Sequence, residues 1–333
     1  MRRVVVAVVA FAAVLLACAG LGAAQLQPYV YKDAYRSHIF ARASYCRSSS
    51  LVGWSCGFIC NTVPGFRTDT TVESDDLDAF GFIGVDDANR QIVVAFRGTS
   101  TATNWLQNIK YFRTPYTISS SCGAACEVHR GFFSTYLSVR PQVNMAVMRL
   151  IGLLPGYQVL VTGHSLGGAM AMLAAVDLQE QFNKMWAPQQ PVVLYTFGAP
   201  RVGNPAFAKW AAGLLAKGPH YRVTHARDPV PHLPPMSFGF LHTPTEVFYR
   251  TTDNSSMRVC ADSATAESED CSNDLWAVGI SDHLTYLGED TGCSCSTCPS
   301  ARMANLNGEA EATMPAHLYA RLTWEYSKSR VGL

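Results

Sequence analysis

Apolar and polar positions along the chain follow two alternating patterns, which predict strands and helices in turn. Three short apolar runs have the length of strands: 158–162, 192–197 and 221–226. Three helix-like stretches lie before, between and after them: about 130–151, 166–183 and 205–216. This alternation is typical of an α/β fold, in which helical crossovers connect the parallel strands of a sheet.

The first hundred residues predict a different arrangement. Residues 29–46 place aromatic and apolar side chains at helical spacing. A connection rich in cysteine and glycine follows. The apolar runs 79–85 and 91–96 then flank the polar residues 86–90, which predicts a β-hairpin.

The N-terminus has the order of parts of a secretory signal peptide. Arg2 and Arg3 precede an apolar run over 4–21 and small residues that end at Ala24. We expect residues 1–24 to be cleaved from the mature protein. Two alternatives stay open: an uncleaved membrane anchor, because the run is long, and a lipid-anchored Cys18.

Composition narrows the class of protein. Of 333 residues, 48% are hydrophobic and 15% are charged, which excludes a disordered chain. The 26 basic and 25 acidic residues give no electrostatic reason to expect nucleic acid as a partner. Eleven cysteines are many for a reducing compartment, so composition also favours a secreted, extracellular protein.

The strongest chemical motif is Gly163-His164-Ser165-Leu166-Gly167, a Gly-x-Ser-x-Gly sequence between a predicted strand and a predicted helix. A strand-to-helix turn this tight strains the backbone at Ser165, and flanking glycines permit the strain because they have no Cβ. The motif predicts a nucleophilic serine. The alternative is a glycine-rich turn that holds an ordinary serine.

A serine nucleophile needs a base and a carboxylate that orients the base. Asp228 follows the run 221–226, at the carboxyl end of a predicted strand, where active-site groups of α/β sheets gather. A simple turn carboxylate is the alternative. Of nine histidines, His242, His283 and His317 have a compatible place in the chain order. His283 is the best candidate, because it follows the last strand-like region and precedes a cysteine that could tie the C-terminal region to the body. A buried structural histidine is an equal alternative from the residues alone.

Acyl transfer also needs hydrogen-bond donors for an oxyanion. The backbone N–H of Leu166, at the start of the helix, is one expected donor. Thr99 follows the strand-like run 91–96, after Arg97 and Gly98. We expect the N–H and the hydroxyl of Thr99 to supply the second set of donors.

With these motifs in place, the sequence resembles the secreted class 3 lipases, which are the fungal-type triacylglycerol lipases and their feruloyl esterase relatives. The matching segments run in family order: Phe96-Arg97-Gly98-Thr99, Val128-His129-Arg130-Gly131-Phe132, 162–169, 198–204, 227–235 and Asp282-His283-Leu284. The resemblance implies an α/β-hydrolase fold with a mostly parallel sheet, helices on both faces and a helical lid. It also implies a catalytic triad of Ser165, Asp228 and His283 and an oxyanion pair of Thr99 and Leu166. We expect a lipase domain over 25–298 and a C-terminal extension of unknown role over 299–333.

The lid is expected at about 100–113. Trp105, Leu106, Ile109 and Phe112 fall on one face of a helix there. A surface helix that packs its apolar side on the body is the alternative, which in lipases similar to this one is the closed state. The apolar face favours long-chain acylglycerols over small aromatic esters. We take Trp105 as the hypothetical anchor of the lid.

The resemblance also implies disulfide bonds. Cys46–Cys293, Cys56–Cys60 and Cys260–Cys271 match the bridges of the family. Cys122–Cys126 and Cys295–Cys298 are further expected pairs that depart from its pattern. Zinc or redox chemistry at Cys295 and Cys298 is a weaker interpretation, because no second pair of ligands completes a site.

The sequence therefore predicts a secreted serine ester hydrolase that cleaves acylglycerols at an oil–water interface through an acyl-enzyme. We expect no metal, no cofactor, no obligate protein partner and a monomer. A phospholipase A1 or a feruloyl esterase with the same triad is the enzymatic alternative. A lipase-fold lipid carrier without catalysis is the alternative from another class.

Overall fold

The computed structural model describes residues 28–99, 105–106, 108–185, 189–275 and 279–293. The expected signal peptide over 1–24, the expected extension over 299–333 and the expected pair Cys295–Cys298 lie outside the described residues. Within the described part, no helix combines the length and the apolar character that crossing a bilayer requires.

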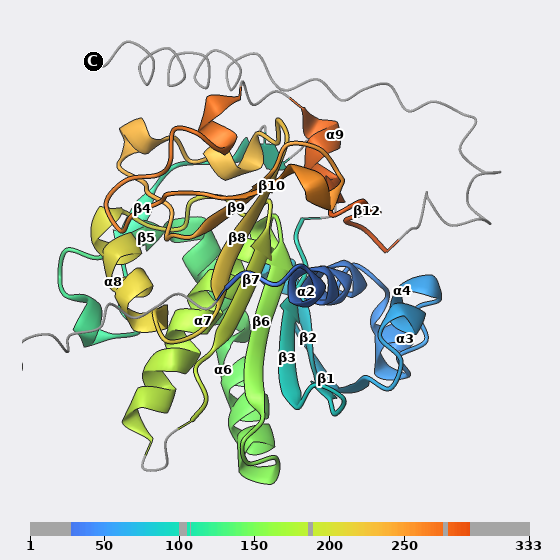
Figure 1. The fold of residues 1–333 in the computed structure, drawn as a ribbon. Coiled ribbons are helices and arrows are strands. Elements are labelled where there is room, and N and C mark those ends of the chain that lie inside the picture. The colour runs from blue at the N-terminus through green and yellow to red at the C-terminus, as the bar shows by residue number, and fades with distance from the viewer. Residues whose placement is uncertain (1–27, 100–104, 107, 186–188, 276–278, 294–333) are drawn as a thin grey trace, which may run out of the picture.

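An eight-stranded sheet forms the centre of the fold, in the order β1-β2-β3-β6-β7-β8-β9-β10 (Figure 1). Neighbouring strands from β3 to β9 pair in parallel, and the pairs β1–β2, β2–β3 and β9–β10 are antiparallel. The strands are β1 Arg67–Ser74, β2 Ala79–Asp86, β3 Gln91–Phe96, β6 Gln158–His164, β7 Val193–Phe197, β8 His220–His225, β9 Glu246–Tyr249 and β10 Met257–Val259. The expected hairpin is β2–β3, and the three expected parallel strands are β6, β7 and β8.

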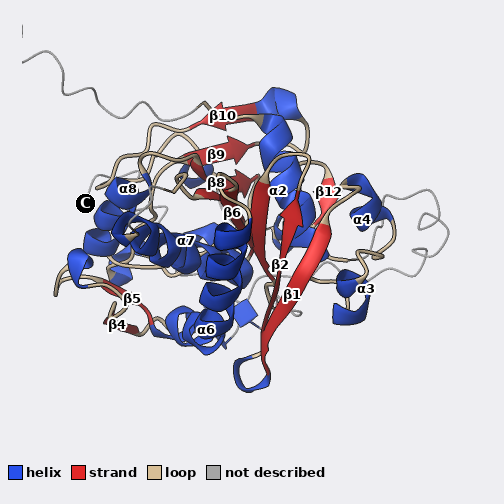
Figure 2. Ribbon diagram, turned by 90° about the horizontal axis from the view of Figure 1, so that it is seen from below, coloured by secondary structure: helices blue, strands red, loops and turns tan. Residues whose placement is uncertain are grey.

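Helices cover both faces of the sheet, as Figure 2 shows. The three long helices of one face are α6 Arg130–Leu153, α7 Leu166–Lys184 and α8 Pro205–Leu215. The other face is covered by α2 Tyr31–Ala43, with the short helices α3 Ser48–Val52 and α4 Phe58–Thr62 beside it. The elements predicted from the apolar pattern occur in the predicted order, but strands β1, β9 and β10 of the sheet were not predicted.

The two-sided cover explains why the strand segments are apolar without interruption. In β3, Ile92 and Val94 belong to the core beneath α6 and α7, whereas Val93 and Ala95 belong to the core beneath α2. A strand that is buried on both faces gains from an apolar side chain at every position. Such strands therefore read as continuous apolar runs.

Disulfide bonds fix the periphery. The described residues contain four: Cys46–Cys293, Cys56–Cys60, Cys122–Cys126 and Cys260–Cys271. Cys46 and Cys293 are 247 positions apart, and their bond joins the segment after α2 to the last described residue. The N-terminal helix is thereby tied to the region that follows His283.

Small elements complete the edge of the sheet at which its parallel strands end. The strand pair β4 Arg113–Pro115 and β5 Glu127–His129 precedes α6. The short helix α9 Ile280–His283 precedes the hairpin of β11 Thr285–Tyr286 and β12 Glu289–Asp290.

Candidate active site

The three residues of the expected triad come from different connections of the sheet. Ser165 lies between β6 and α7, Asp228 follows β8, and His283 is the last residue of α9. All three side chains are buried: Ser165 and Asp228 are 2% exposed and His283 is fully covered. The site is closed to bulk solvent in this structure.

Ser165 sits on a sharp turn with φ 59° and ψ −129°. Non-glycine residues rarely adopt a positive φ, and such strain gathers at functional sites. A Cβ at Gly163 would lie 2.2 Å from the carbonyl oxygen of Gly167, and a Cβ at Gly167 would lie 2.2 Å from that of Phe96. Both positions therefore require glycine for the turn to pack against β3 and the first turn of α7.

Asp228 and His283 are in contact although 55 positions separate them. His283 Nδ1 donates a hydrogen bond of 2.8 Å to Asp228 Oδ2. The other carboxylate oxygen accepts a 2.8 Å bond from the backbone N–H of Val230. Since Nδ1 carries the proton, Nε2 on the opposite side of the ring is the free acceptor position of a neutral imidazole.

Nε2 of His283 is buried and has no hydrogen-bond partner among the described residues. Ser165 Oγ therefore makes no hydrogen bond to it here. Catalytic hydrogen bonds are commonly long in an unliganded enzyme and tighten when substrate binds. The geometry joins the aspartate to the histidine and leaves one imidazole nitrogen unoccupied.

Tyr286 is a site residue that the sequence reasoning missed. Its hydroxyl donates a 2.5 Å bond to Asp228 Oδ2, the same oxygen that accepts from His283. Burial and the neighbouring carboxylate hold the pKa of Tyr286 well above its usual value, so the phenol stays protonated. Tyr286 lies three residues after His283 but in strand β11, beyond the end of α9, so no helical spacing linked the two residues in the sequence.

His164 supports the backbone of His283. Its Nε2 donates a 2.8 Å bond to the carbonyl of His283, and its Nδ1 accepts a 2.8 Å bond from the hydroxyl of Tyr45. Burial holds the pKa of His164 well below its usual value, which keeps the imidazole neutral and able to make both bonds. The residue that precedes Ser165 thus also fixes the segment that carries His283.

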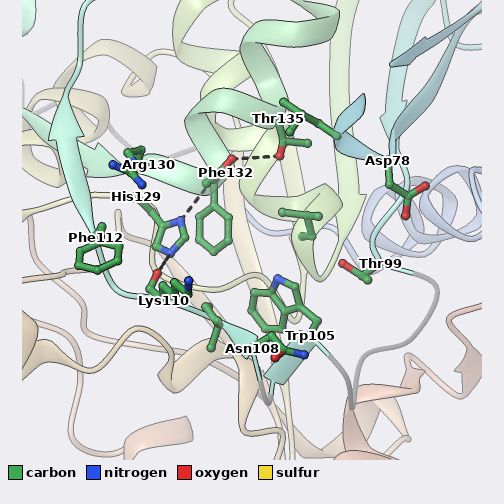
Figure 3. A pocket seen from close by; sticks show the side chains of 14 residues that line it. Asp78, Thr99, Trp105, Asn108, Lys110, Phe112, His129, Arg130, Phe132 and Thr135 are labelled. Atoms are coloured by element: carbon green, nitrogen blue, oxygen red, sulfur yellow. Dashed lines mark hydrogen bonds between the residues drawn. The ribbon is translucent and has the colours of Figure 1, made fainter. Parts of the chain in front are cut away.

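A pocket of about 410 Å³ adjoins the turn (Figure 3). Thr99 and Leu166, the expected oxyanion pair, both line it. The hydroxyl of Thr99 is buried without a hydrogen-bond partner among the described residues. An unpaired buried donor is costly, and it is available to an oxyanion that arrives with substrate.

The described part of the lid segment, 105–106 and 108–113, covers the site with one fully buried side chain. Leu106 packs with Val230 and Leu233, which follow Asp228, and with Ile280, which precedes His283. Trp105 is half-buried and stacks on Phe132 at a centroid distance of 6.1 Å. Ile109 is partly buried against the hydrophobic core that contains Phe132.

The expected position of Phe112 on the apolar face is wrong. The described helical residues end at Asn108, and Phe112 is 58% exposed. Its carbonyl accepts a 2.8 Å bond from the N–H of Arg130, and the next residues pair as β4 with β5. Strand pairing takes the backbone out of the helix, so the helical spacing no longer applies at Phe112.

His129 connects the end of the lid segment to α6. Its Nε2 donates a 2.5 Å bond to the carbonyl of Lys110, and its Nδ1 accepts from the N–H of Phe132 in the first turn of α6. Burial lowers the pKa of His129 to about 4, opposed by the bond to Lys110. Near neutral pH the ring of His129 is therefore uncharged and caps the N-terminus of α6.

One group of described residues, Glu246, Cys260 and Cys271, has the spacing of a metal site. The two cysteines are bonded to each other. A disulfide offers no thiolate, so this group does not fit a metal ion.

Comparison with known proteins identifies the family. A protein-family model described as "Lipase (class 3)" matches residues 93–238. A secreted mono- and diacylglycerol lipase of Fusarium solani is 31% identical over 273 residues, which cover 79% of this chain and 77% of that protein. The chain belongs to the class 3 lipase family.

Other members of the class 3 lipase family agree with this assignment. The lipase of Rhizomucor miehei is 36% identical over 253 residues, 75% of this chain and 66% of that protein, so the chain spans just under two thirds of this relative. A solved triacylglycerol lipase, described as having a serine protease triad as its catalytic centre, superposes with a TM-score of 0.70 at 33% identity. The superposition covers 80% of this chain and 99% of that structure, and it confirms the α/β-hydrolase fold.

Proposed function

We propose that this protein is a secreted serine ester hydrolase that cleaves acylglycerols through an acyl-enzyme. One observation carries the proposal: Ser165 stands on a strained turn beside an apolar pocket, and a buried, hydrogen-bonded Asp228–His283 pair lies at the same edge of the sheet. Membership of a family with a serine-triad lipase supports the same chemistry.

In the proposed reaction, Ser165 Oγ attacks the ester carbonyl while His283 Nε2 takes its proton. His283 then gives that proton to the leaving alcohol as the carbon–oxygen bond breaks. Water attacks the acyl-enzyme with His283 again as base, which releases the fatty acid and restores Ser165. Asp228 holds the imidazole with its Nδ1 proton and stabilises its charged form.

Thr99 and Leu166 are proposed to hold the oxyanion. The N–H of Leu166 belongs to the first turn of α7, whose positive end of the helix dipole favours a developing negative charge. The buried hydroxyl of Thr99 has no partner within the described part of the chain and can donate to an oxyanion. Loss of one such donor typically lowers turnover by about 10²–10³-fold.

Access requires movement of the lid segment, because the triad is buried. The contacts of Leu106 and Trp105 hold the segment down in water, at roughly 1.5–3 kcal/mol for each large side chain that is fully buried. A lipid surface offers apolar contacts that replace them. This supports activity at an oil–water interface.

Acylglycerols are the substrate class that we favour. Relatives are named a triacylglycerol lipase and a mono- and diacylglycerol lipase. Trp105, Ile109, Phe132 and Leu166 give the pocket apolar walls that suit an acyl chain. Three features support secretion. They are the disulfides, the leader-like residues 1–24 and the word "secreted" in the name of the Fusarium protein.

A substrate panel tests the proposal. Purified mature protein and its Ser165→Ala variant are assayed on glycerides of increasing chain length, on phosphatidylcholine and on methyl ferulate. We expect glycerides to give the highest kcat/KM and the variant to lose activity on all of them. Higher kcat/KM on phospholipid or ferulate would reassign the substrate, and activity that survives in the variant would overturn the mechanism.

A further inference from the structure

Exposed aromatic and cationic side chains gather beside the mouth of the pocket. We define the mouth patch as Lys110, Tyr111, Phe112, Arg113, Arg130 and Phe238. Phe112 is 58% exposed and Phe238 is 40% exposed, and the three cations are exposed as well. An exposed group of large apolar side chains next to a pocket is a candidate interaction surface.

Contacts connect the consecutive residues 110–113 with Arg130 on one hand and with the region of Phe238 on the other. The guanidinium of Arg130 lies 5.6 Å from the ring centroid of Phe112. The rings of Tyr111 and Phe238 meet edge to face at 5.1 Å. Arg113 donates a 3.2 Å bond to the carbonyl of Gly239, directly after Phe238. Two chain segments that are far apart in sequence thus share one surface.

Three residues of the patch border the pocket. Lys110, Phe112 and Arg130 line the pocket at the end away from Thr99, as Figure 3 shows. Asp78 lies at the same end as Thr99. An interface that contacts the patch is therefore adjacent to the pocket that Thr99 and Leu166 also line.

Charge is distributed unequally around the mouth. The patch has three cations, and among the described residues Glu127 forms an ion pair with one of them, at 3.2 Å from Arg113. The opposite side has the acidic turn of Asp75, Asp76 and Asp78, of which Asp78 pairs with Arg97. The mouth is therefore cationic where the aromatic rings are exposed and acidic across the pocket.

We infer that the mouth patch docks the protein on an anionic lipid surface, with the acidic turn held away from it. This inference rests on the proposed function and adds the charge of the interface. Aromatic rings and cations side by side suit the headgroup region of a membrane, where cations meet phosphate and rings reach the acyl boundary. Each cation near an anionic bilayer changes partitioning by roughly fivefold at low salt.

The test measures binding separately from hydrolysis. Mature protein with Ser165→Ala is sedimented with vesicles of phosphatidylcholine, either alone or mixed with phosphatidylglycerol, at low and at high salt. We expect binding to the anionic vesicles to be at least tenfold stronger at low salt and to weaken at high salt. The triple variant Lys110→Gln, Arg113→Gln, Arg130→Gln should lose most of that preference.

A matched control removes three other exposed cations, in Arg149→Gln, Lys184→Gln, Lys217→Gln. These lie at or just beyond the C-terminal ends of α6, α7 and α8, which run away from the carboxyl edge of the sheet. The control should keep the anionic preference. Phe238→Ser, outside the pocket lining, should weaken vesicle binding and keep turnover of a soluble short-chain ester.

Three outcomes would overturn the inference. The first is equal binding of the Ser165→Ala protein to neutral and anionic vesicles. The second is an equal loss of the anionic preference in the triple variant and in the control. The third is a triple variant that keeps its preference for anionic vesicles. None of them bears on hydrolysis, because every binding measurement uses the inactive protein. Failure of the proposed function would instead appear as a lack of ester turnover in the unmodified protein.

Discussion

Ser165 was identified from local sequence, whereas its partners were not. Two glycines, an apolar run before and a helix-like run after it define the turn, and all of these lie within about twenty residues. Asp228 and His283 meet only through the tertiary fold, so the residues alone left His242 and His317 open. The residues alone favoured His283, the family resemblance strengthened that choice, and a hydrogen bond of 2.8 Å joins His283 to Asp228.

Tyr286 provides a prediction at the residue scale. Tyr286→Phe removes one donor from a buried carboxylate but leaves the His283 bond in place. We expect kcat to fall several-fold with KM unchanged, and the free energy of unfolding to fall by roughly 2 kcal/mol, since the bond is to a charged acceptor. Steady-state kinetics and urea unfolding measure both.

The matched control is Tyr157→Phe, which removes a similar bond to the exposed carboxylate of Asp87. It should leave kcat unchanged. A Tyr286→Phe enzyme with unaltered kcat would show that the tyrosine fills space without supporting the aspartate.

His129 provides a prediction of pH dependence. Its pKa is about 4 in the folded protein and about 6.5 in an unfolded chain. Between these values the unfolded state binds the proton and the folded state does not, so stability is lost as pH falls from 6.5 towards 4. His129→Gln cannot take up a proton, so the variant lacks this part of the loss.

Thermal unfolding from pH 4 to pH 7 measures the difference. The melting temperature of the wild type should exceed that of the variant most at pH 7, and the gap should narrow as pH falls. A gap that stays constant over this range would contradict a neutral, buried His129.

At the scale of elements, the lid segment shows where sequence periodicity stops being informative. Spacing placed four apolar residues on one helical face, and three of them do pack inward. Phe112 does not, because the backbone of the next residues pairs with β5, a partner that begins 14 positions further on. Periodicity reports local structure, and strand pairing over that distance overrides it.

The lid provides a prediction at the same scale. Leu106→Ala removes the side chain that packs on the segments next to Asp228 and His283, so we expect activity on a monomeric ester to rise roughly tenfold relative to an emulsion. Trp105→Ala should have a smaller effect, because that side chain is only half-buried. Leu153→Ala, on an exposed residue at the end of α6, is the control.

The ratio of the two activities is measured for all three variants in parallel. An unchanged ratio in both lid variants would contradict the claim that Leu106 and Trp105 hold the lid segment over the active site. A larger effect of Trp105→Ala would restore the tryptophan as the anchor that the sequence suggested.

For the whole molecule, the apolar pattern was sufficient to predict an α/β sheet with parallel crossovers, whereas the cover of helices on both faces came from the family resemblance. Strands buried on both faces read as continuous apolar runs, and the helices between them set parallel crossovers. Side-chain chemistry was less predictable: the contacts of Tyr286 and of Tyr45 join segments more than fifty positions apart. Periodicity contains no information about such contacts.

The bond between Cys46 and Cys293 acts at this scale too. Replacing both cysteines by serine frees a segment of the unfolded chain 247 positions long. In the chain-entropy description this costs on the order of 5 kcal/mol. We expect a lower urea midpoint, and a reduction in kcat at temperatures where the His283 region loosens. A urea midpoint equal to that of the wild type would contradict the claim that the Cys46–Cys293 bond stabilises the folded protein.

The central claim is that Ser165 is a nucleophile activated by His283. An alkyl phosphonate p-nitrophenyl ester, added in detergent micelles that open the lid, reacts with such a serine, and peptide mass spectrometry locates the adduct. The account predicts one adduct, on Ser165, that is absent in His283→Ala. Adducts on other serines, or equal labelling of Ser165 in His283→Ala, would contradict it.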